Sequence, residues 1–340
     1  ISCCRERSIH YNSLRPVFIY GPDDYANREN IFFKWIDEAG QVLYPEDATG
    51  SFQMVYAKDV ATVILGLCKR DDLYDMAFNL CGNERLSYDS FLEALEYAVD
   101  KPFTRVNLTL DDIKTRNIPL PFPLTEEESE RYVSLNSGKL DISYTDIREG
   151  LKETYDKYRE SRIFETIDGY FDENKPGEAE GFMLCELEGG RKRGNDRLIL
   201  KILNELIGYY RQTSEKEKLL KAIDEAYELA GEESTKGSNE YATTLLNCAN
   251  AYRSLGELER AEDLYISTEK VYERNIADGR LLPDDMLIAG FYNNKSLLYQ
   301  EMGEHEKAEE CLKKALAISE ANKAGFETAV TYANLANTAV

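Results

Sequence analysis

Asparagines recur at one helical position in the second half of the chain and could bind a peptide. An asparagine side chain carries a donor and an acceptor side by side, which matches the N–H and C=O groups of an extended peptide backbone. Asparagine is also a poor helix former, so its recurrence inside helical segments needs a reason. The alternative is that these amides bond neighbouring helices and only fix the packing of the repeats. The candidate peptide-binding residues are Asn204, Asn247, Asn250, Asn294, Asn334 and Asn337.

A second candidate site lies where the apolar run RPVFIY, residues 15–20, ends in a Gly-Pro turn. Tyr20, Gly21 and Pro22 could form the wall of a substrate pocket. The alternative is a tight strand-to-loop turn without a ligand. Asp59 could orient a pocket loop, or it could simply be an acidic residue at a helix N-terminus, where the macrodipole favours it.

The chain offers few residues for acid–base, nucleophilic or metal chemistry. It contains only two histidines, His10 and His305, which argues against a zinc site and a histidine-dependent triad. Seven cysteines with no Cys-x-x-Cys pair are most simply free thiols of a reducing cytosol. We find no nucleophile–base pair, no metal-ligand spacing and no phosphate loop. We therefore predict no catalytic, cofactor-binding or metal-binding residue in this chain, and a cytoplasmic location.

The size and charge of the chain limit its class and its partners. Its 340 residues are enough for two domains, and a hydrophobic content of 43% can supply their cores. The formal net charge of −22 argues against a nucleic acid or an anionic membrane as the main partner, since both bind basic patches. No apolar run reaches the length of a membrane span, and no signal peptide is visible.

Strand and helix patterns alternate in residues 1–163. The run at 15–20 is continuously apolar, which predicts one strand covered on both faces. The alternation predicts an α/β domain with a largely parallel sheet. The predicted strands are residues 15–20, 52–57, 76–82 and 103–110, and the predicted helices are residues 28–40, 58–70, 87–100 and 144–161.

Four stretches of this half resemble the C-terminal part of extended short-chain dehydrogenase/reductases, the NAD-dependent epimerase/dehydratase family. LRPVFIYGP is similar to the strand after that family's catalytic helix, and FQMVYAKDVATVILGLC to its segment with Asp-Val-Ala. AFNLCGNERLSYDSFLEAL is similar to a strand–helix unit of the family, and KLDISYTDIREGLKETYDKY to its closing helix. The resemblance covers nearly all of residues 10–160 and implies a partial Rossmann-like domain.

The parts of that family that bind the cofactor and move protons do not occur in this sequence. In a doubly wound fold a glycine-rich turn follows the first strand, because only glycine lets the backbone approach the pyrophosphate. No such motif occurs, and Arg15 stands four residues after Tyr11, where the family's Tyr-x-x-x-Lys has lysine. Phe18 and Phe52 stand where nucleotide-sugar members often carry Asn and a basic residue. The resemblance therefore implies no catalysis and no bound cofactor for this chain as given, and NAD(P) for a full-length parent.

Residues 164–340 have a helical pattern with an internal repeat at a shift of 47 residues, which relates LLNCANAYRSLGELERAEDLY (245–265) to FYNNKSLLYQEMGEHEKAEECL (291–312). Tyr252, Gly256 and Ala261 are typical of a helix, a turn and the close-packed point of a second helix. They resemble the tetratricopeptide repeat, a unit of about 34 residues, which implies an all-α solenoid. The copy at 198–231 lacks the turn glycine. The expected copies are 198–231, 242–275, 289–322 and a truncated one at 329–340.

We interpret the chain as a tetratricopeptide scaffold that binds a peptide or protein segment, fused to an incomplete epimerase-like domain. Residues 1–163 form the epimerase-like part and residues 164–340 the solenoid. The alternative is a fragment of an NAD(P)-dependent epimerase/dehydratase or reductase whose cofactor half lies upstream, with the repeats as a regulatory or assembly arm. A third explanation is two neighbouring genes read as one chain. Because the chain opens with Ile1 and its last repeat stops after one helix, we expect further chain at both ends.

Overall fold

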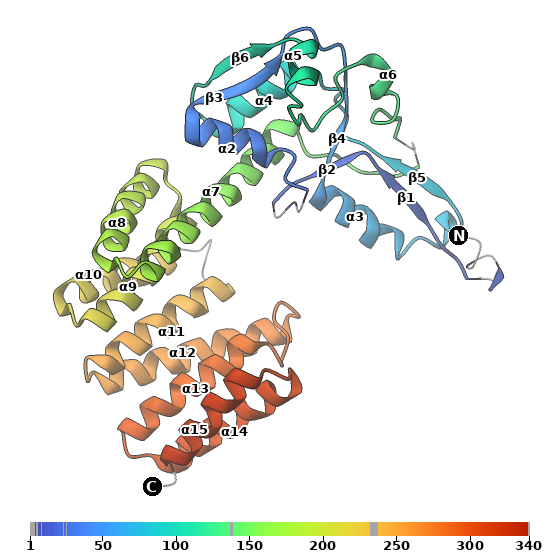
Figure 1. Cartoon of the computed structure of the whole chain (residues 1–340). Coiled ribbons are helices and arrows are strands. Elements are labelled where there is room, and N and C mark those ends of the chain that lie inside the picture. The colour runs from blue at the N-terminus through green and yellow to red at the C-terminus, as the bar shows by residue number, and fades with distance from the viewer. Residues whose placement is uncertain are drawn as a thin grey trace. The chain divides into compact units, whose positions relative to one another are not determined.

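A computed structural model describes residues 4, 6, 7, 9–22, 24, 26–136, 139–231 and 237–338 (Figure 1). The chain divides into two compact units, residues 1–165 and residues 166–340, called unit 1 and unit 2 below. Helix α7 (Ile147–Asp172) runs through the boundary. Among the described residues, no helix combines the length and the apolar character that crossing a membrane requires.

The strands described in unit 1 pair two by two, and every pair is parallel. In the second pair Phe18 lies opposite Met54, and Tyr20 lies opposite Tyr56. Parallel strands joined by helices are typical of the α/β class that the alternating pattern predicts. The pairs are β1 (Ser13–Pro16) with β5 (Ala77–Leu80), β2 (Phe18–Tyr20) with β4 (Met54–Tyr56), and β3 (Gln41–Pro45) with β6 (Thr104–Leu108).

The apolar run at residues 15–20 differs from the prediction in two ways. It forms the end of β1 and all of β2, because the chain bends at Val17 and changes its pairing partner. It is also covered on one face only. Phe18 and Tyr20 are buried, whereas Ile19, which points to the opposite face, is 36% exposed.

Local signals account for most helices of unit 1. Ser87 caps one helix by accepting a hydrogen bond from the N–H of Ser90 at 3.2 Å, and Gly40, at φ +64°, ends another. The closing helix α7 continues to Asp172, beyond the predicted end at residue 161. Besides α7, the helices are α2 (Asn30–Ala39), which ends at Gly40, α3 (Ala57–Leu67), α4 (Tyr88–Val99), which Ser87 caps, α5 (Leu110–Thr115) and α6 (Glu126–Ser129).

An aromatic cluster forms the main core of unit 1. The rings of Phe52 and Phe122 stack with their centroids 4.1 Å apart, and Phe91 meets Phe122 edge-on at 4.9 Å. Phe18 contacts both stacked rings, and Phe32 stacks on Phe122 at 6.0 Å. Phe18 and Phe52, the two apolar residues noted at family positions that are often polar, are thus buried core residues.

Unit 2 consists of helices that pack in successive pairs (Figure 1). Gly256 and Gly303, at φ +77° and +76°, make the turns inside two pairs, and Ala261 and Ala308 are fully buried at the close-packed points. In the degenerate copy Ser214, at φ +60°, takes the place of the turn glycine. The helices are α8 (Pro176–Arg193), α9 (Asp196–Thr213), α10 (Lys216–Ala230), α11 (Asn239–Ser254), α12 (Leu258–Ala277), α13 (Met286–Glu301), α14 (His305–Ala321) and α15 (Gly325–Thr338).

Candidate peptide-binding groove

A cavity of about 640 Å³ lies in unit 2 along the first helices of two successive pairs, α9 and α11. These helices contact each other directly. Each begins at a capping side chain: Asn195 accepts a hydrogen bond from the N–H of Leu198 at 3.1 Å, and Ser238 accepts one from the N–H of Tyr241 at 3.0 Å. The lining residues are Asp196, Arg197, Leu200, Lys201, Asn204, Ser238, Asn239, Glu240 and Thr243.

Most residues that line the cavity are polar and carry charges of both signs, but apolar atoms supply the larger part of its wall. Arg197 and Lys201 come from α9, and Glu240 from α11 lies 4.0 Å from the Arg197 guanidinium. An exposed ion pair at this distance contributes little to stability, so Arg197 and Glu240 can exchange it for contacts with a ligand. The cavity volume lies within the range of about 300–1,000 Å³ that is typical of ligand sites.

Asn204 is the predicted binding residue that lines this cavity, and it also links the two helices. Its Nδ2 donates to Thr244 Oγ1 at 3.0 Å, and its Oδ1 accepts from Asn247 Nδ2 at 3.1 Å. The predicted alternative, in which the amides fix the packing of the repeats, thus accounts for these two contacts. An amide group has two N–H donors and two acceptor lone pairs, so Asn204 keeps one of each for a ligand.

A similar link joins α13 and α15, but it uses a residue that the sequence reading did not select. Asn293 Nδ2 donates to Thr331 Oγ1 at 2.9 Å, and Asn334 Nδ2 reaches Asn293 Oδ1 at 3.4 Å. Asn294, which aligns with Asn247, instead donates to the main-chain oxygen of Gly290 in its own helix at 2.9 Å. The alignment of repeats therefore selected Asn294, whereas the residue that links the two helices is Asn293, one position earlier in the chain.

The two asparagines three residues further on have different surroundings. Asn250 is 5% exposed, and its Oδ1 accepts a hydrogen bond from the hydroxyl of Tyr265. Asn337 is exposed on α15. Neither lines the cavity between α9 and α11. Peptide binding by the six asparagines stays a prediction.

The hydroxyl of Tyr265 is expected to stabilise unit 2, and Tyr265→Phe tests this. Tyr265 is fully buried, burial raises its pKa to about 12, and its hydroxyl also lies 3.2 Å from the main-chain oxygen of Asn294. Removing the hydroxyl leaves Asn250 Oδ1 buried without a donor, which should cost about 1–3 kcal/mol. Urea unfolding followed by helical circular dichroism measures the loss. Tyr227→Phe, at a 51% exposed tyrosine of α10, is the matched control and should change nothing.

Tyr20 is the last residue of β2, and Gly21 and Pro22 begin the turn that follows it. Gly21 has a φ of +146°, and a Cβ at this position would lie 3.1 Å from the ring of Tyr56. Tyr20 is 2% exposed, and burial raises the pKa of its hydroxyl. It lines a cavity of only about 130 Å³, whereas Gly21 and Pro22 do not line it. A substrate-pocket role for the three residues stays a prediction.

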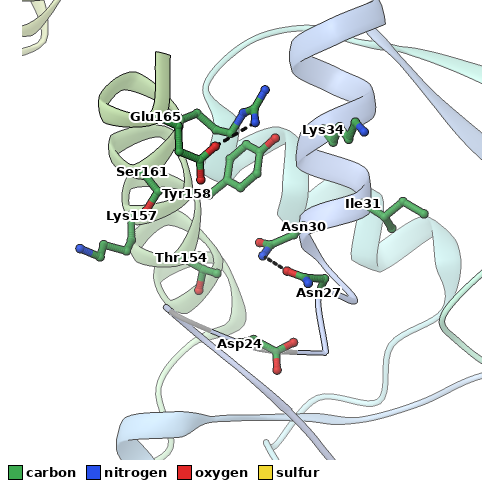
Figure 2. A pocket seen from close by; sticks show the side chains of 11 residues that line it. Asp24, Asn27, Asn30, Ile31, Lys34, Thr154, Lys157, Tyr158, Ser161 and Glu165 are labelled. Carbon is green, nitrogen blue, oxygen red and sulfur yellow. Dashed lines mark hydrogen bonds and ion pairs between the residues drawn. The ribbon is translucent and has the colours of Figure 1, made fainter. Parts of the chain in front are cut away.

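A larger groove of unit 1, which the sequence reading missed, lies between α2 and α7 and has a volume of about 710 Å³. Figure 2 shows that its side chains come from the two helices and from the loop before α2. Several of its polar groups already bind each other, for example Arg162 with Glu165 at 2.9 Å and Asn30 with Asn27 at 2.9 Å. A helical stripe on α7 could have revealed it, since its lining residues there are Thr154, Lys157, Tyr158, Ser161, Arg162 and Glu165.

Among the described residues, no group of three or more His, Cys, Asp or Glu side chains could hold a metal ion. Burial raises the pKa of two of the described thiols, to about 12 for Cys248 and about 11 for Cys311. Both thiols are therefore poor nucleophiles.

Two family models of the tetratricopeptide repeat match the chain, at residues 244–270 and 289–322. The matches confirm that unit 2 contains these repeats. Such repeats stack into a concave surface that binds proteins, which supports a protein-binding role.

A curated relative is the chloroplast stem-loop binding protein of 41 kDa b of Arabidopsis thaliana. It is 27% identical over 93 residues, which is 27% of this chain and 25% of that protein. The chain thus spans about a quarter of the length of the curated relative that it matches.

Two solved structures have a weak similarity to this chain. A Podosopora anserina putative kinesin light chain with TPR-like repeats is 16% identical, with a TM-score of 0.44, over 53% of this chain and 85% of that one. The UDP-N-acetylglucosamine 4-epimerase of Methanobrevibacter ruminantium is 15% identical, with a TM-score of 0.37, over 47% of this chain and 49% of that one. Both TM-scores are below 0.5, which is too low to establish a shared fold.

Proposed function

We propose that unit 2 binds a peptide or protein segment in the groove between α9 and α11. The observation that carries this proposal is the cavity of about 640 Å³, whose wall combines charges of both signs with the amide of Asn204. An extended segment offers alternating donors and acceptors along its backbone, which suit the donor and acceptor that Asn204 keeps. The tetratricopeptide matches at residues 244–270 and 289–322, the first of which overlaps α11, support the same reading.

The kind of partner follows from the net charge and from the wall of the groove. A formal net charge of −22 disfavours nucleic acid, although the Arabidopsis relative is named for binding a stem-loop. It equally disfavours an anionic membrane. A protein segment with charges of both signs could pair with Arg197, Lys201 and Glu240 across the groove.

Replacing Asn204 with alanine is expected to weaken peptide binding. The probe is a peptide selected on the full chain from a phage library of random dodecapeptides and then synthesised. Loss of the amide should weaken its binding roughly three- to tenfold, since one or two hydrogen bonds between neutral groups disappear. Isothermal titration calorimetry measures the change. Gln212→Ala, an exposed amide of the same helix, is the control and should bind as the wild type does.

Binding that is equally strong in the wild type and in Asn204→Ala would contradict the use of this groove. A selected peptide whose affinity is the same for every variant in the groove of unit 2 would lead to the same conclusion. Thermal unfolding of each variant shows whether a loss of binding reflects a loss of structure.

We further propose that unit 1 corresponds to the C-terminal part of an extended short-chain dehydrogenase/reductase. Its parallel strands β2, β4 and β5 lie in the stretches that carry the resemblance. The tight turn at Gly21 follows β2, at the point where the resemblance has its Gly-Pro turn. NAD(P) is proposed only for a longer parent, in which the repeats would be a regulatory or assembly arm.

A further inference from the structure

We propose that Asn275 is a positioning residue, which orients the amide of Asn239 so that its Nδ2 donates to a backbone carbonyl of the bound segment. This inference rests on the proposed function of the groove. Asn239 is the first residue of α11 and lines the cavity. Asn275 comes from α12, is 1% exposed and does not line the cavity.

The orientation of Asn239 follows from one hydrogen bond behind the cavity wall. Asn275 Nδ2 donates to Asn239 Oδ1 at 2.8 Å. The acceptor end of the Asn239 amide is therefore engaged away from the cavity. Within the part of the chain that the structure describes, no residue accepts a hydrogen bond from Asn239 Nδ2. The donor end is left for a ligand.

The buried end of the pair supports a role beyond packing. Asn275 Oδ1 is buried and has no hydrogen-bond partner among the described residues. A buried acceptor without a partner destabilises a fold, and each such group in a native structure calls for an explanation. Fixing the amide of Asn239 explains why a polar side chain is kept at this depth.

The ligand chemistry follows from what faces the cavity. Arg197 and Lys201 are cations that can only donate, and Asn239 adds an oriented neutral donor. A neutral amide donor matches a neutral carbonyl, whereas a carboxylate would be drawn to the two cations. We therefore assign Asn239 to a main-chain carbonyl of an extended segment rather than to an acidic side chain.

The main test is Asn239→Asp, measured on the full chain with the selected dodecapeptide by calorimetry. Aspartate still offers an oxygen to Asn275 and is well tolerated at the start of a helix, so the fold should be kept. It presents a second oxygen to the cavity in place of Nδ2. Binding should weaken roughly tenfold or more, because one hydrogen bond is lost and two acceptors face each other. Asn239→Ala should weaken binding less.

A double-mutant cycle separates positioning from general stability. Asn275→Ala should weaken binding roughly three- to tenfold in the wild type and should have no further effect in Asn239→Ala. Replacing one peptide amide at a time by an ester weakens the carbonyl as an acceptor. At one position this replacement should weaken binding to the wild type but not to Asn239→Ala.

Additive effects of the two substitutions, or an ester effect that persists in Asn239→Ala, would overturn this inference. So would unchanged binding in Asn239→Asp. If binding depends on Asn204 but not on Asn239 or Asn275, the proposed groove stands and only this inference fails. If no selected peptide depends on Asn204, the proposed function itself fails.

Discussion

Replacing Phe122 with alanine is expected to lower the free energy of unfolding of unit 1 by about 4 kcal/mol, since truncating a buried aromatic ring costs about 3–5 kcal/mol. Phe122 is 3% exposed and stacks on Phe52 with a centroid distance of 4.1 Å. Phe18 and Phe91 meet the same ring edge-on. Removing one ring from this cluster leaves a cavity that rigid neighbouring rings fill poorly.

The single tryptophan of the chain makes this measurement specific to unit 1. Trp35 lies on α2 with its ring 5.4 Å from that of Phe32, next to the aromatic cluster. Urea unfolding followed by tryptophan fluorescence therefore reports unit 1. Phe326→Ala, the same change at a 78% exposed phenylalanine of unit 2, should leave the transition where it is. A loss below about 1 kcal/mol in Phe122→Ala would place the core elsewhere.

Elements with strong periodicity and local end signals were predictable from the sequence. The hairpin turns of unit 2 follow from Gly256 and Gly303, because glycine adopts a positive φ without strain. The turn at Ser214 was not predictable, since a residue other than glycine rarely adopts a positive φ. Strand β3 (Gln41–Pro45) was also missed, because it is a short run directly after a helix and takes its place by pairing with β6.

The candidate site was predictable only in part, for a physical reason. Repeat alignment identifies which residues occupy equivalent positions, and it selected Asn204. Repeat alignment does not show whether the oxygen or the nitrogen of an asparagine amide already has a hydrogen-bond partner. Asn239 and Asn275 stand outside the repeated position, and only their contact across α11 and α12 reveals a possible role.

A buried carboxylate beside the turn of Gly21 leads to the second large effect. Glu29 is fully buried at the start of α2, and its Oε1 accepts a hydrogen bond from the N–H of Gly21 at 3.2 Å. Its Oε2 is buried without a partner among the described residues. Burial raises the pKa of Glu29 from 4.5 to about 7, Asp24 raises it further, and hydrogen bonds from main-chain N–H groups together with Arg28 oppose the rise.

This raised pKa makes unit 1 less stable as the pH rises. Between pH 4.5 and about 7 the unfolded chain has released the proton while the folded chain still holds it. The free energy of unfolding should therefore fall across this window by about 3 kcal/mol from Glu29 alone, at about 1.4 kcal/mol per unit of pKa difference. Above pH 7 the loss is complete, and below pH 4.5 it is absent.

Glu29→Gln is expected to stabilise unit 1 at pH 8 by up to about 3 kcal/mol and to have little effect at pH 4, where the wild-type side chain is protonated. Glutamine keeps the oxygen that accepts from Gly21 and cannot be ionised. Tryptophan fluorescence during urea unfolding, repeated from pH 4 to pH 8, gives the difference between variant and wild type. Glu93→Gln, at an exposed glutamate of α4, is the matched control for replacing a carboxylate by an amide. Because other groups titrate equally in both proteins, a flat difference for Glu29→Gln would show that the pKa of Glu29 does not differ between the folded and the unfolded chain.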